Sequence, residues 1–125
     1  MICLDTNYLI RGLSEGTEEA AKLVAWNKAG EPLITPMLAW FEFICGPVTQ
    51  DQTTTMRAFL TEIVPFAEAE AEESARLFNA INRKRSRRVD AMIAGTAINA
   101  KARLATQNRV TNYLTKRRAG CILRA

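Results

Sequence analysis

Three acidic residues stand apart from the other charges of this sequence and could together hold a metal ion. Asp5 is the only charged residue among the first ten, and it follows the apolar run Ile2-Cys3-Leu4. Glu42 is the only charged residue between positions 32 and 50, and Asp90 is the only acid after position 75. Carboxylate oxygens suit Mg²⁺ or Mn²⁺, and such ions can activate water and stabilise the leaving oxygen in phosphodiester cleavage. The three acids therefore indicate metal-dependent chemistry on a phosphate ester.

Two of these acids also have ordinary structural interpretations. An Asp that follows a strand commonly caps the next helix, and this could be the whole role of Asp5. Glu42 could lie on the solvent side of an amphipathic helix, although an ionised carboxylate in so apolar a segment otherwise needs a partner or a metal. The sequence alone leaves both interpretations open beside the metal site.

The charges are strongly segregated along the chain. Residues 1–75 carry 12 acids and 4 bases, a net charge of −8, whereas residues 76–125 carry 13 bases and 1 acid, a net charge of +12. A basic half of this strength favours a polyanion partner, nucleic acid in particular, over a merely solubilising surface. Five bases directly precede Val89-Asp90 and would form a rim that binds phosphate beside a buried acid: Arg83, Lys84, Arg85, Arg87 and Arg88.

Short apolar runs alternate with longer helical patterns along the chain. The expected strands are 2–4, 33–34, 63–66, 104–105 and 121–123. The expected helices are 8–13, 17–29, one from Pro36 that Gly46-Pro47 ends, 50–61, 68–83, 90–100 and 111–117. This alternation predicts a parallel α/β fold with helices on both faces of the sheet. Right-handed crossovers then place the ends of the first and fourth strands at one edge.

The helix after the second strand carries the most specific local expectations. Thr35 is expected to be its N-cap, with Pro36 at the favoured first position. The side chains that follow helical spacing, and are therefore expected to face the core, are Met37, Trp40, Phe41 and Ile44.

The composition predicts one domain that spans residues 1–125, long enough for a hydrophobic core. No apolar run approaches the ~20 residues of a membrane helix, and the N-terminus lacks a signal-peptide pattern. Cys3, Cys45 and Cys121 lie in apolar contexts and are expected to be buried free thiols in a reducing cytoplasm. The absence of histidine excludes Ser-His and Cys-His catalysis.

Four stretches of the sequence resemble the PIN-domain proteins, and within them the VapC-type toxin ribonucleases of toxin–antitoxin pairs. In chain order they are Leu4-Asp5-Thr6-Asn7, Ala39-Trp40-Phe41-Glu42-Phe43-Ile44-Cys45-Gly46, Arg88-Val89-Asp90-Ala91-Met92-Ile93-Ala94 and Leu104-Ala105-Thr106-Gln107-Asn108. Their order and spacing fit the family across nearly the whole chain. The resemblance implies a PIN-like three-layer α/β/α fold around a short, mostly parallel sheet.

The same resemblance implies an activity, a site and partners. It implies a Mg²⁺- or Mn²⁺-dependent endoribonuclease, with Asp5, Glu42 and Asp90 as the catalytic, metal-binding acids. The residues that it implies as supporting the site are Thr6, Asn7, Thr106, Asn108, Thr111 and Asn112. Beside the basic run, Arg109 and residues 116–118 are weaker candidates for binding RNA, and a tRNA or rRNA loop is a plausible target. The implied partners are a VapB-type antitoxin, whose C-terminal segment would cover the site, and a second copy of the chain.

The sequence departs from the family pattern at one position. A fourth acid is usual a few residues beyond Asn108, where this chain has Thr111 with Asn112 beside it. We therefore expect one firmly bound ion and a second that binds only with substrate. The departure leaves an alternative open, a catalytically silent PIN domain that binds RNA or an antitoxin without cleavage. A haloacid dehalogenase-type phosphatase is disfavoured, because Asn7 stands where that chemistry needs a second Asp.

Overall fold

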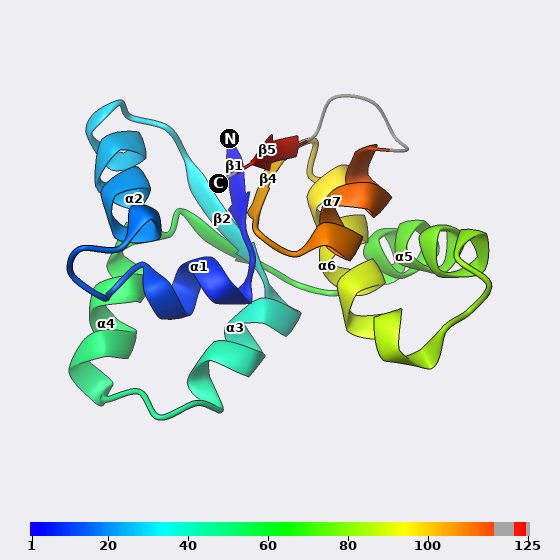
Figure 1. Ribbon diagram of the computed structural model, residues 1–125, viewed down its shortest axis with the longest axis horizontal. Helices are drawn as coiled ribbons and strands as arrows, with labels where there is room; N and C mark the ends of the chain where they lie inside the picture. Colours follow the sequence, from blue (N-terminus) through cyan, green and yellow to red (C-terminus); the bar gives the residue numbers. More distant parts are fainter. Residues whose placement is uncertain (117–121, 125) are drawn as a thin grey trace.

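Five strands form the central sheet of the molecule (Figure 1). The computed structural model describes residues 1–116 and 122–124, without the side chains at positions 110, 112, 116 and 122–124. The strands are β1 (Ile2–Leu4), β2 (Leu33–Pro36), β3 (Glu62–Val64), β4 (Arg103–Thr106) and β5 (Ile122–Arg124). Within the described chain every pairing between them is parallel. The expected parallel α/β fold is confirmed.

Helices cover both sides of the sheet. They are α1 (Thr6–Arg11), α2 (Glu18–Lys28), α3 (Met37–Ile44), α4 (Gln50–Phe59), α5 (Glu68–Ala80), α6 (Arg88–Asn99) and α7 (Arg109–Lys116), with a short 3-10 helix at Arg85–Arg87. In Figure 1, α1, α2 and α4 lie on one side of the sheet and α5, α6 and α7 on the other. None of the described helices has the length and apolar character needed to cross a membrane.

The strand order reverses at β1. Across the sheet the order is β3-β2-β1-β4-β5, so the chain first builds outward on one side of β1 and later on the other. Leu4 at the end of β1 is in register with Ala105 of β4, and the next residues, Asp5 and Thr106, hydrogen-bond to each other. In open α/β sheets such a reversal opens a crevice at the carboxyl ends of the strands, where ligands bind. The topology thus puts Asp5 at the edge where a site is expected.

A hydrophobic core fills the space between the sheet and the helices. All three residues of β1 are completely buried. Helix α6 is the most central helix, because it contacts the core beneath the sheet through Ile93 and Ala97 and a second cluster shared with α5 and α7 through Ala91 and Ala94. The small residues of α6 allow this close packing on two sides, which fixes the position of Asp90 in its first turn.

Local backbone signals set the ends of several helices. Asp5 is the N-cap of α1, since its Oδ1 accepts a hydrogen bond from the Tyr8 backbone N–H at 3.2 Å. The capping role considered for Asp5 is therefore real. Helix α5 ends at Ala80, earlier than the expected residue 83, because Asn82 and Arg83 adopt positive φ angles of 61° and 56°. The basic run consequently lies outside α5.

The expected start of α3 is wrong. Thr35 is not its N-cap but belongs to β2, where its hydroxyl donates to the backbone carbonyl of Leu4 at 2.7 Å. Pro36 ends the same strand and does not occupy the first helical position, which is held by Met37. β2 extends two residues beyond the apolar pair Leu33-Ile34. Thr35 therefore lies within the sheet, and its hydroxyl bonds to β1 instead of capping α3.

The expected inward face of α3 is right for Trp40, which is half-buried and packs against the core, and wrong for the other three residues. Ala39 and Phe43 are buried, whereas Met37, Phe41 and Ile44 are 41%, 59% and 45% exposed. Because α3 is apolar on nearly every side, helical spacing alone could not identify the side that packs inward.

The cysteines follow expectation only in part. Cys3 is a buried free thiol, and burial raises its pKa. Cys45 is a free thiol but is exposed, because it follows the outward side of α3. Cys121 lies outside the described residues.

Candidate metal and nucleic-acid site

A pocket at the carboxyl ends of β1 and β4 brings the three predicted acids together. Asp5, Glu42 and Asp90 all line it, and its volume is about 410 Å³. Its other lining residues are Thr6, Asn7, Ser86, Val89, Ile93, Asn108 and Thr111. Four of the six predicted supporting residues are in this group, Thr106 contacts Asp5 directly, and the side chain of Asn112 is not described.

Asp5 is the most buried of the three acids, at 5% exposure. One carboxylate oxygen accepts from the Tyr8 backbone, and the other accepts from the Thr106 hydroxyl. Burial raises the pKa of Asp5, hydrogen bonds from Thr106, Tyr8 and Asn7 act in the opposite direction, and the charge of Asp90 raises it further. A carboxylate fixed in this way is both a helix cap and a preoriented ligand.

Glu42 lies on the exposed side of α3, yet it borders the pocket. Its Oε1 accepts a hydrogen bond from the Thr6 hydroxyl at 2.7 Å. Thr6 is the first residue of α1, so this contact joins the helices that follow β1 and β2. The two interpretations of Glu42 are therefore compatible, because its carboxylate is on the solvent side of α3 and also faces the site.

Asp90 lies in the first turn of α6, with 19% of its side chain exposed. Burial raises its pKa, the Arg87 guanidinium at 3.7 Å acts in the opposite direction, and the charge of Glu42 raises the pKa again. Hydrogen bonds from Asn108 Nδ2, at 3.3 Å, and from the Thr111 hydroxyl hold the carboxylate. Asp90 is thus electrostatically linked to both other acids.

The turn between β4 and α7 connects two of the acids. Thr106 donates to Asp5, and its hydroxyl also accepts from the Asn108 backbone N–H at 3.0 Å. Asn108 in turn donates to Asp90, and its Oδ1 accepts from the Thr111 backbone N–H at 3.1 Å. The motif Thr106-Gln107-Asn108 therefore acts as a polar bridge across the crevice.

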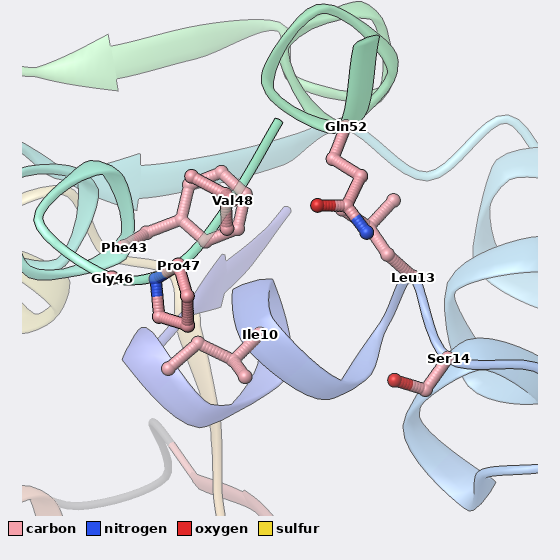
Figure 2. Close-up of a pocket in the computed structure, with 8 residues that line it drawn as sticks. All are labelled: Ile10, Leu13, Ser14, Phe43, Gly46, Pro47, Val48 and Gln52. Carbon is pink, nitrogen blue, oxygen red and sulfur yellow. The ribbon is translucent and has the colours of Figure 1, made fainter. Parts of the chain in front are cut away.

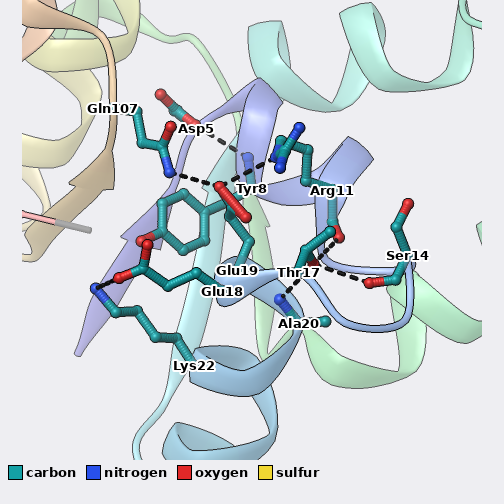
Figure 3. Close-up of polar contacts among 10 residues, drawn as sticks. All are labelled: Asp5, Tyr8, Arg11, Ser14, Thr17, Glu18, Glu19, Ala20, Lys22 and Gln107. Carbon is teal, nitrogen blue, oxygen red and sulfur yellow. Dashed lines mark hydrogen bonds and ion pairs between the residues drawn. The ribbon is translucent and has the colours of Figure 1, made fainter.

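A buried carboxylate that the sequence reasoning did not single out supports this turn from the other side (Figure 3). Glu19 in α2 is 1% exposed, and its Oε1 accepts from Gln107 Nε2 at 2.5 Å and from Arg11 Nε at 3.1 Å. Glu19 Oε2 has no hydrogen-bond partner in the described structure. The sequence did contain a signal for the burial of Glu19. Positions 19, 23 and 26 share one face of the helix, and Leu23 and Trp26 are apolar.

The basic residues divide between different surfaces. Lys84, Arg87 and Arg109 line a second hollow beside the acidic pocket. Arg88 instead lies over the ring of Phe78, 5.9 Å from its centroid, on the α5 side. Arg83 and Arg85 are exposed. The predicted phosphate-binding run is therefore not one continuous rim.

The donors of the acidic pocket fit a hard divalent cation in chemistry and in charge. All three acids offer carboxylate oxygens, the ligands that Mg²⁺ and Mn²⁺ prefer. Burial is the first cause of the raised pKa values of Asp5 and Asp90, and the charge of a neighbouring carboxylate raises each pKa further. Among the described residues no three His, Cys, Asp or Glu side chains are already grouped as a metal-binding cluster. The fit is thus one of donor type and charge, not of a preformed coordination shell.

Several solved structures are similar to this chain in fold. A toxin–antitoxin complex from Klebsiella pneumoniae is 28% identical, with a TM-score of 0.68, over 86% of this chain and 87% of that chain. FitAcB from Neisseria gonorrhoeae is 19% identical, with a TM-score of 0.67, over 99% and 96%. VapBC2 from Rickettsia felis, bound to a DNA fragment from their promoter, is 17% identical, with a TM-score of 0.66, over 100% and 98%. The latter two show similarity of fold alone.

The sequence comparison identifies the family. Comparison with curated proteins gives no match. The family model of the PIN domain, however, matches residues 2–114, which is most of the chain. The protein belongs to the PIN domain family.

Proposed function

We propose that this chain is a metal-dependent endoribonuclease and the toxin of a VapBC-type toxin–antitoxin pair, acting as a single domain in the cytoplasm. The observation that carries the proposal is the pocket in which Asp5, Glu42 and Asp90 meet beside a basic surface. Membership of the PIN domain family supports it, because PIN domains are generally nucleases.

Asp5, Glu42 and Asp90 would hold Mg²⁺ or Mn²⁺. When bound, such an ion would lower the pKa of water and stabilise negative charge on a phosphodiester. The contribution of the chain is to orient the ligands before substrate binds: Thr106 and the α1 backbone fix Asp5, and Asn108 holds Asp90. Thr6 does the same for Glu42.

Thr111 sets the expected number of ions. It lines the pocket and donates to Asp90, so a neutral hydroxyl stands where the resemblance leads us to expect a fourth acid. With one negative charge fewer, a second divalent ion would bind firmly only when the substrate phosphate contributes its own oxygens.

A protein partner is the second part of the proposal. We propose a VapB-type antitoxin and a second copy of the chain as partners, and the similar toxin–antitoxin complex from Klebsiella pneumoniae supports the antitoxin. Ile10, Phe41 and Ile44 are large apolar side chains that remain 45–59% exposed. Beside them an apolar pocket of about 220 Å³ opens between α1, α3 and α4, with Phe43 and Val48 among its walls (Figure 2). Exposed apolar surface of this kind supports a protein interface.

The alternative function is a silent PIN domain that binds RNA or an antitoxin without cleaving. The observation that favours it is again Thr111, because the pocket has three acids where the family usually has four. Metal affinity distinguishes the two functions, since a silent domain has no need to bind Mn²⁺ through Asp5 and Asp90.

Cleavage of total cellular RNA by the purified protein, free of antitoxin, tests the proposal. Reactions contain Mn²⁺, Mg²⁺ or EDTA, and they compare the unmodified protein with Asp90→Asn. Asp51→Asn is the matched control, because Asp51 is an exposed acid in the first turn of α4, away from the pocket. We expect discrete fragments with either metal, none with EDTA, and none with Asp90→Asn, while Asp51→Asn cleaves normally.

Two other results would decide against the nuclease. Intact RNA in every lane, from protein that still binds RNA, favours the silent domain. Equal cleavage by Asp90→Asn would mean that the activity does not come from this pocket.

A further inference from the structure

A second hollow adjoins the acidic pocket and is lined by basic side chains, an aromatic ring and an amide. Its volume is about 410 Å³, and its walls include Ile81, Asn82, Lys84, Arg87, Arg109 and Tyr113. No acidic side chain is among its lining residues. Lys84, Arg87 and Arg109 therefore give it three positive charges, and we call it the basic hollow.

The basic hollow and the acidic pocket share two walls. From the segment around the 3-10 helix, Ser86 and Asp90 line the acidic pocket, whereas Lys84 and Arg87 line the basic hollow. The start of α7 divides in the same way, since Thr111 lines the first and Tyr113 the second. Arg87 spans the boundary, with its guanidinium 3.7 Å from Asp90. A chain of phosphates that crosses the acidic pocket would meet the basic hollow next.

The composition of the basic hollow suits a nucleotide better than a bare phosphate. Tyr113 is 53% exposed and is one of the residues that line the hollow. Proteins commonly bind single-stranded nucleic acids with an aromatic ring beside cationic side chains. The nucleobase stacks on the ring, and the phosphate binds the lysine and arginine side chains. A site for phosphate alone would need the cations but neither Tyr113 nor the apolar wall at Ile81.

The neighbouring Arg88 shows that this grouping is selective. It follows Arg87 directly, yet it lies over Phe78 and lines a groove between α5 and α6. Two adjacent arginines thus serve different surfaces, and only Arg87 faces both the basic hollow and the acid site. From the basic run, Lys84 and Arg87 line the hollow that an RNA strand leaving the acidic pocket would meet.

We propose that the basic hollow binds one unpaired nucleotide of the RNA substrate, adjacent to the phosphate that is cleaved, with its base stacked on Tyr113. The proposal rests on the nuclease function above and deepens it, because it makes an unpaired nucleotide beside the cleavage position a requirement. A base inside a duplex is stacked on both faces, so the hollow selects single strands and loops over helices.

Binding of a short fluorescein-labelled single-stranded RNA, measured by fluorescence anisotropy in EDTA, tests the proposal without cleavage. The variants are Tyr113→Ala, Tyr113→Phe and Arg109→Ala. Lys28→Ala is the control for charge, because Lys28 is exposed at the end of α2, on the other side of the sheet. The same RNA without its bases, and a duplex of the same sequence, serve as competitor probes, and circular dichroism confirms that each variant is folded.

We expect Tyr113→Ala to weaken binding of the RNA about 5- to 140-fold, the range that corresponds to one stacked base. Tyr113→Phe keeps the ring and should bind as the unmodified protein does. The abasic strand should bind the unmodified protein and Tyr113→Ala equally weakly. Log affinity falls as log salt concentration rises. Arg109→Ala should make the magnitude of this slope smaller by about 1, whereas Lys28→Ala leaves the slope unchanged.

Three outcomes overturn the proposal: no RNA binding by the unmodified protein, equal binding by Tyr113→Ala, or equal loss in Tyr113→Ala and Tyr113→Phe. The nuclease function fails separately. RNA that binds through Tyr113 but stays intact with Mn²⁺ keeps the basic hollow and refutes catalysis. RNA that Tyr113→Ala binds and cleaves normally refutes the basic hollow and keeps catalysis.

Discussion

Thr111 affects the electrostatic repulsion between the carboxylates of the acidic pocket. It is 2% exposed and donates its hydroxyl to Asp90, so it lowers the local negative potential where a fourth carboxylate would raise it. We predict that Thr111→Asp binds Mn²⁺ about tenfold more tightly or better, because it adds a carboxylate ligand and a negative charge to the site. In EDTA the same variant should melt at a lower temperature than the unmodified protein, since an added buried charge is then uncompensated.

Calorimetric titration with Mn²⁺ and a melting curve in EDTA measure these two effects. Thr111→Val is the matched control, because it keeps the shape of the side chain and removes only the hydroxyl. Unchanged Mn²⁺ affinity in Thr111→Asp would mean that position 111 does not face the ion.

Glu19 has a positioning role that is separate from binding. It holds Gln107, whose neighbours Thr106 and Asn108 contact Asp5 and Asp90. We predict that Glu19→Ala lowers the free energy of unfolding by about 1–3 kcal/mol, because it removes the hydrogen bonds that the buried Glu19 carboxylate accepts from Gln107 and Arg11. We also predict that it lowers kcat of RNA cleavage more than it raises KM, because the acids are displaced while the basic hollow is intact.

Glu19→Gln distinguishes this role from a general loss of packing. It retains Oε1 as an acceptor for Gln107, so it should restore most of kcat. Full activity in Glu19→Ala, or equal damage in both variants, would contradict the positioning role.

At the scale of elements, α3 provides the clearest test of the structure against the sequence pattern. Phe43 is completely buried and Phe41 is 59% exposed, although both are phenylalanines of one apolar helix. Phe43→Ala is predicted to destabilise the protein by about 3–5 kcal/mol, the usual range for a buried Phe. Phe41→Ala should stay within roughly 0.5 kcal/mol. Urea unfolding of both variants gives the comparison, and equal losses would contradict the assigned face of α3.

The close contact between α5 and α6 depends on one glycine. A Cβ on Gly95 would lie 2.8 Å from Ser74 Cα, a backbone atom that cannot move independently of α5. In an exposed helix, Gly→Ala would be favourable by about 1 kcal/mol. Here we predict that Gly95→Ala is net destabilising, because overpacking of this kind typically costs about 1–3 kcal/mol. Thermal melting followed by circular dichroism checks it, and an unchanged or higher Tm would contradict the contact.

The elements show which features the sequence could predict. Strands and helices alternate with clear breaks, so the parallel α/β fold was predictable, as were acids beyond the ends of strands. The inward side of α3 was not, because an all-apolar helix has no contrast between its faces. Glu19 was hidden for the opposite reason: an acid in the first turn of a helix already has a sufficient local explanation in the helix dipole.

The division of the basic run could not be predicted either. Arg87 and Arg88 are chemically identical neighbours, and only the chain path after α5 decides which one faces the acidic site. That path depends on the positive φ angles of Asn82 and Arg83, which end α5 before the run begins. Spacing on a continuous helix, the only guide in the sequence, therefore did not apply to these residues.

For the molecule as a whole, the sheet topology is what creates the acidic site. β1 and β4 are neighbours in the sheet but lie about one hundred residues apart in sequence, and the strand order reverses between them. Asp5 at the end of β1 and Asp90 at the start of α6 meet only when the sheet is complete. Folding free energy thus holds like charges together, and the stability of the whole molecule should depend on their protonation and on metal.

The sign of this dependence follows from the raised pKa values of Asp5 and Asp90. A carboxyl whose pKa is higher in the folded state binds its proton more tightly there, so its favourable contribution is complete below its ordinary pKa of about 4. That contribution is lost as the pH rises through the raised value. Without metal, these two residues therefore make the protein less stable at neutral pH than at mildly acidic pH. A divalent ion should reverse the trend, because it binds the deprotonated form.

We predict that the difference in Tm between Asp90→Asn and the unmodified protein depends on pH, since the titrating groups that both proteins share cancel in this comparison. In EDTA at neutral pH, Asp90→Asn should have the higher Tm, and the difference should shrink as the pH falls toward 4. With Mn²⁺ at roughly 100 times its Kd, the unmodified protein should gain about 2.7 kcal/mol, and Asp90→Asn much less. Differential scanning calorimetry across this pH range measures both. A difference in EDTA that does not change with pH, or an equal gain from Mn²⁺ in both proteins, would show that Asp90 neither carries the raised pKa nor binds the ion.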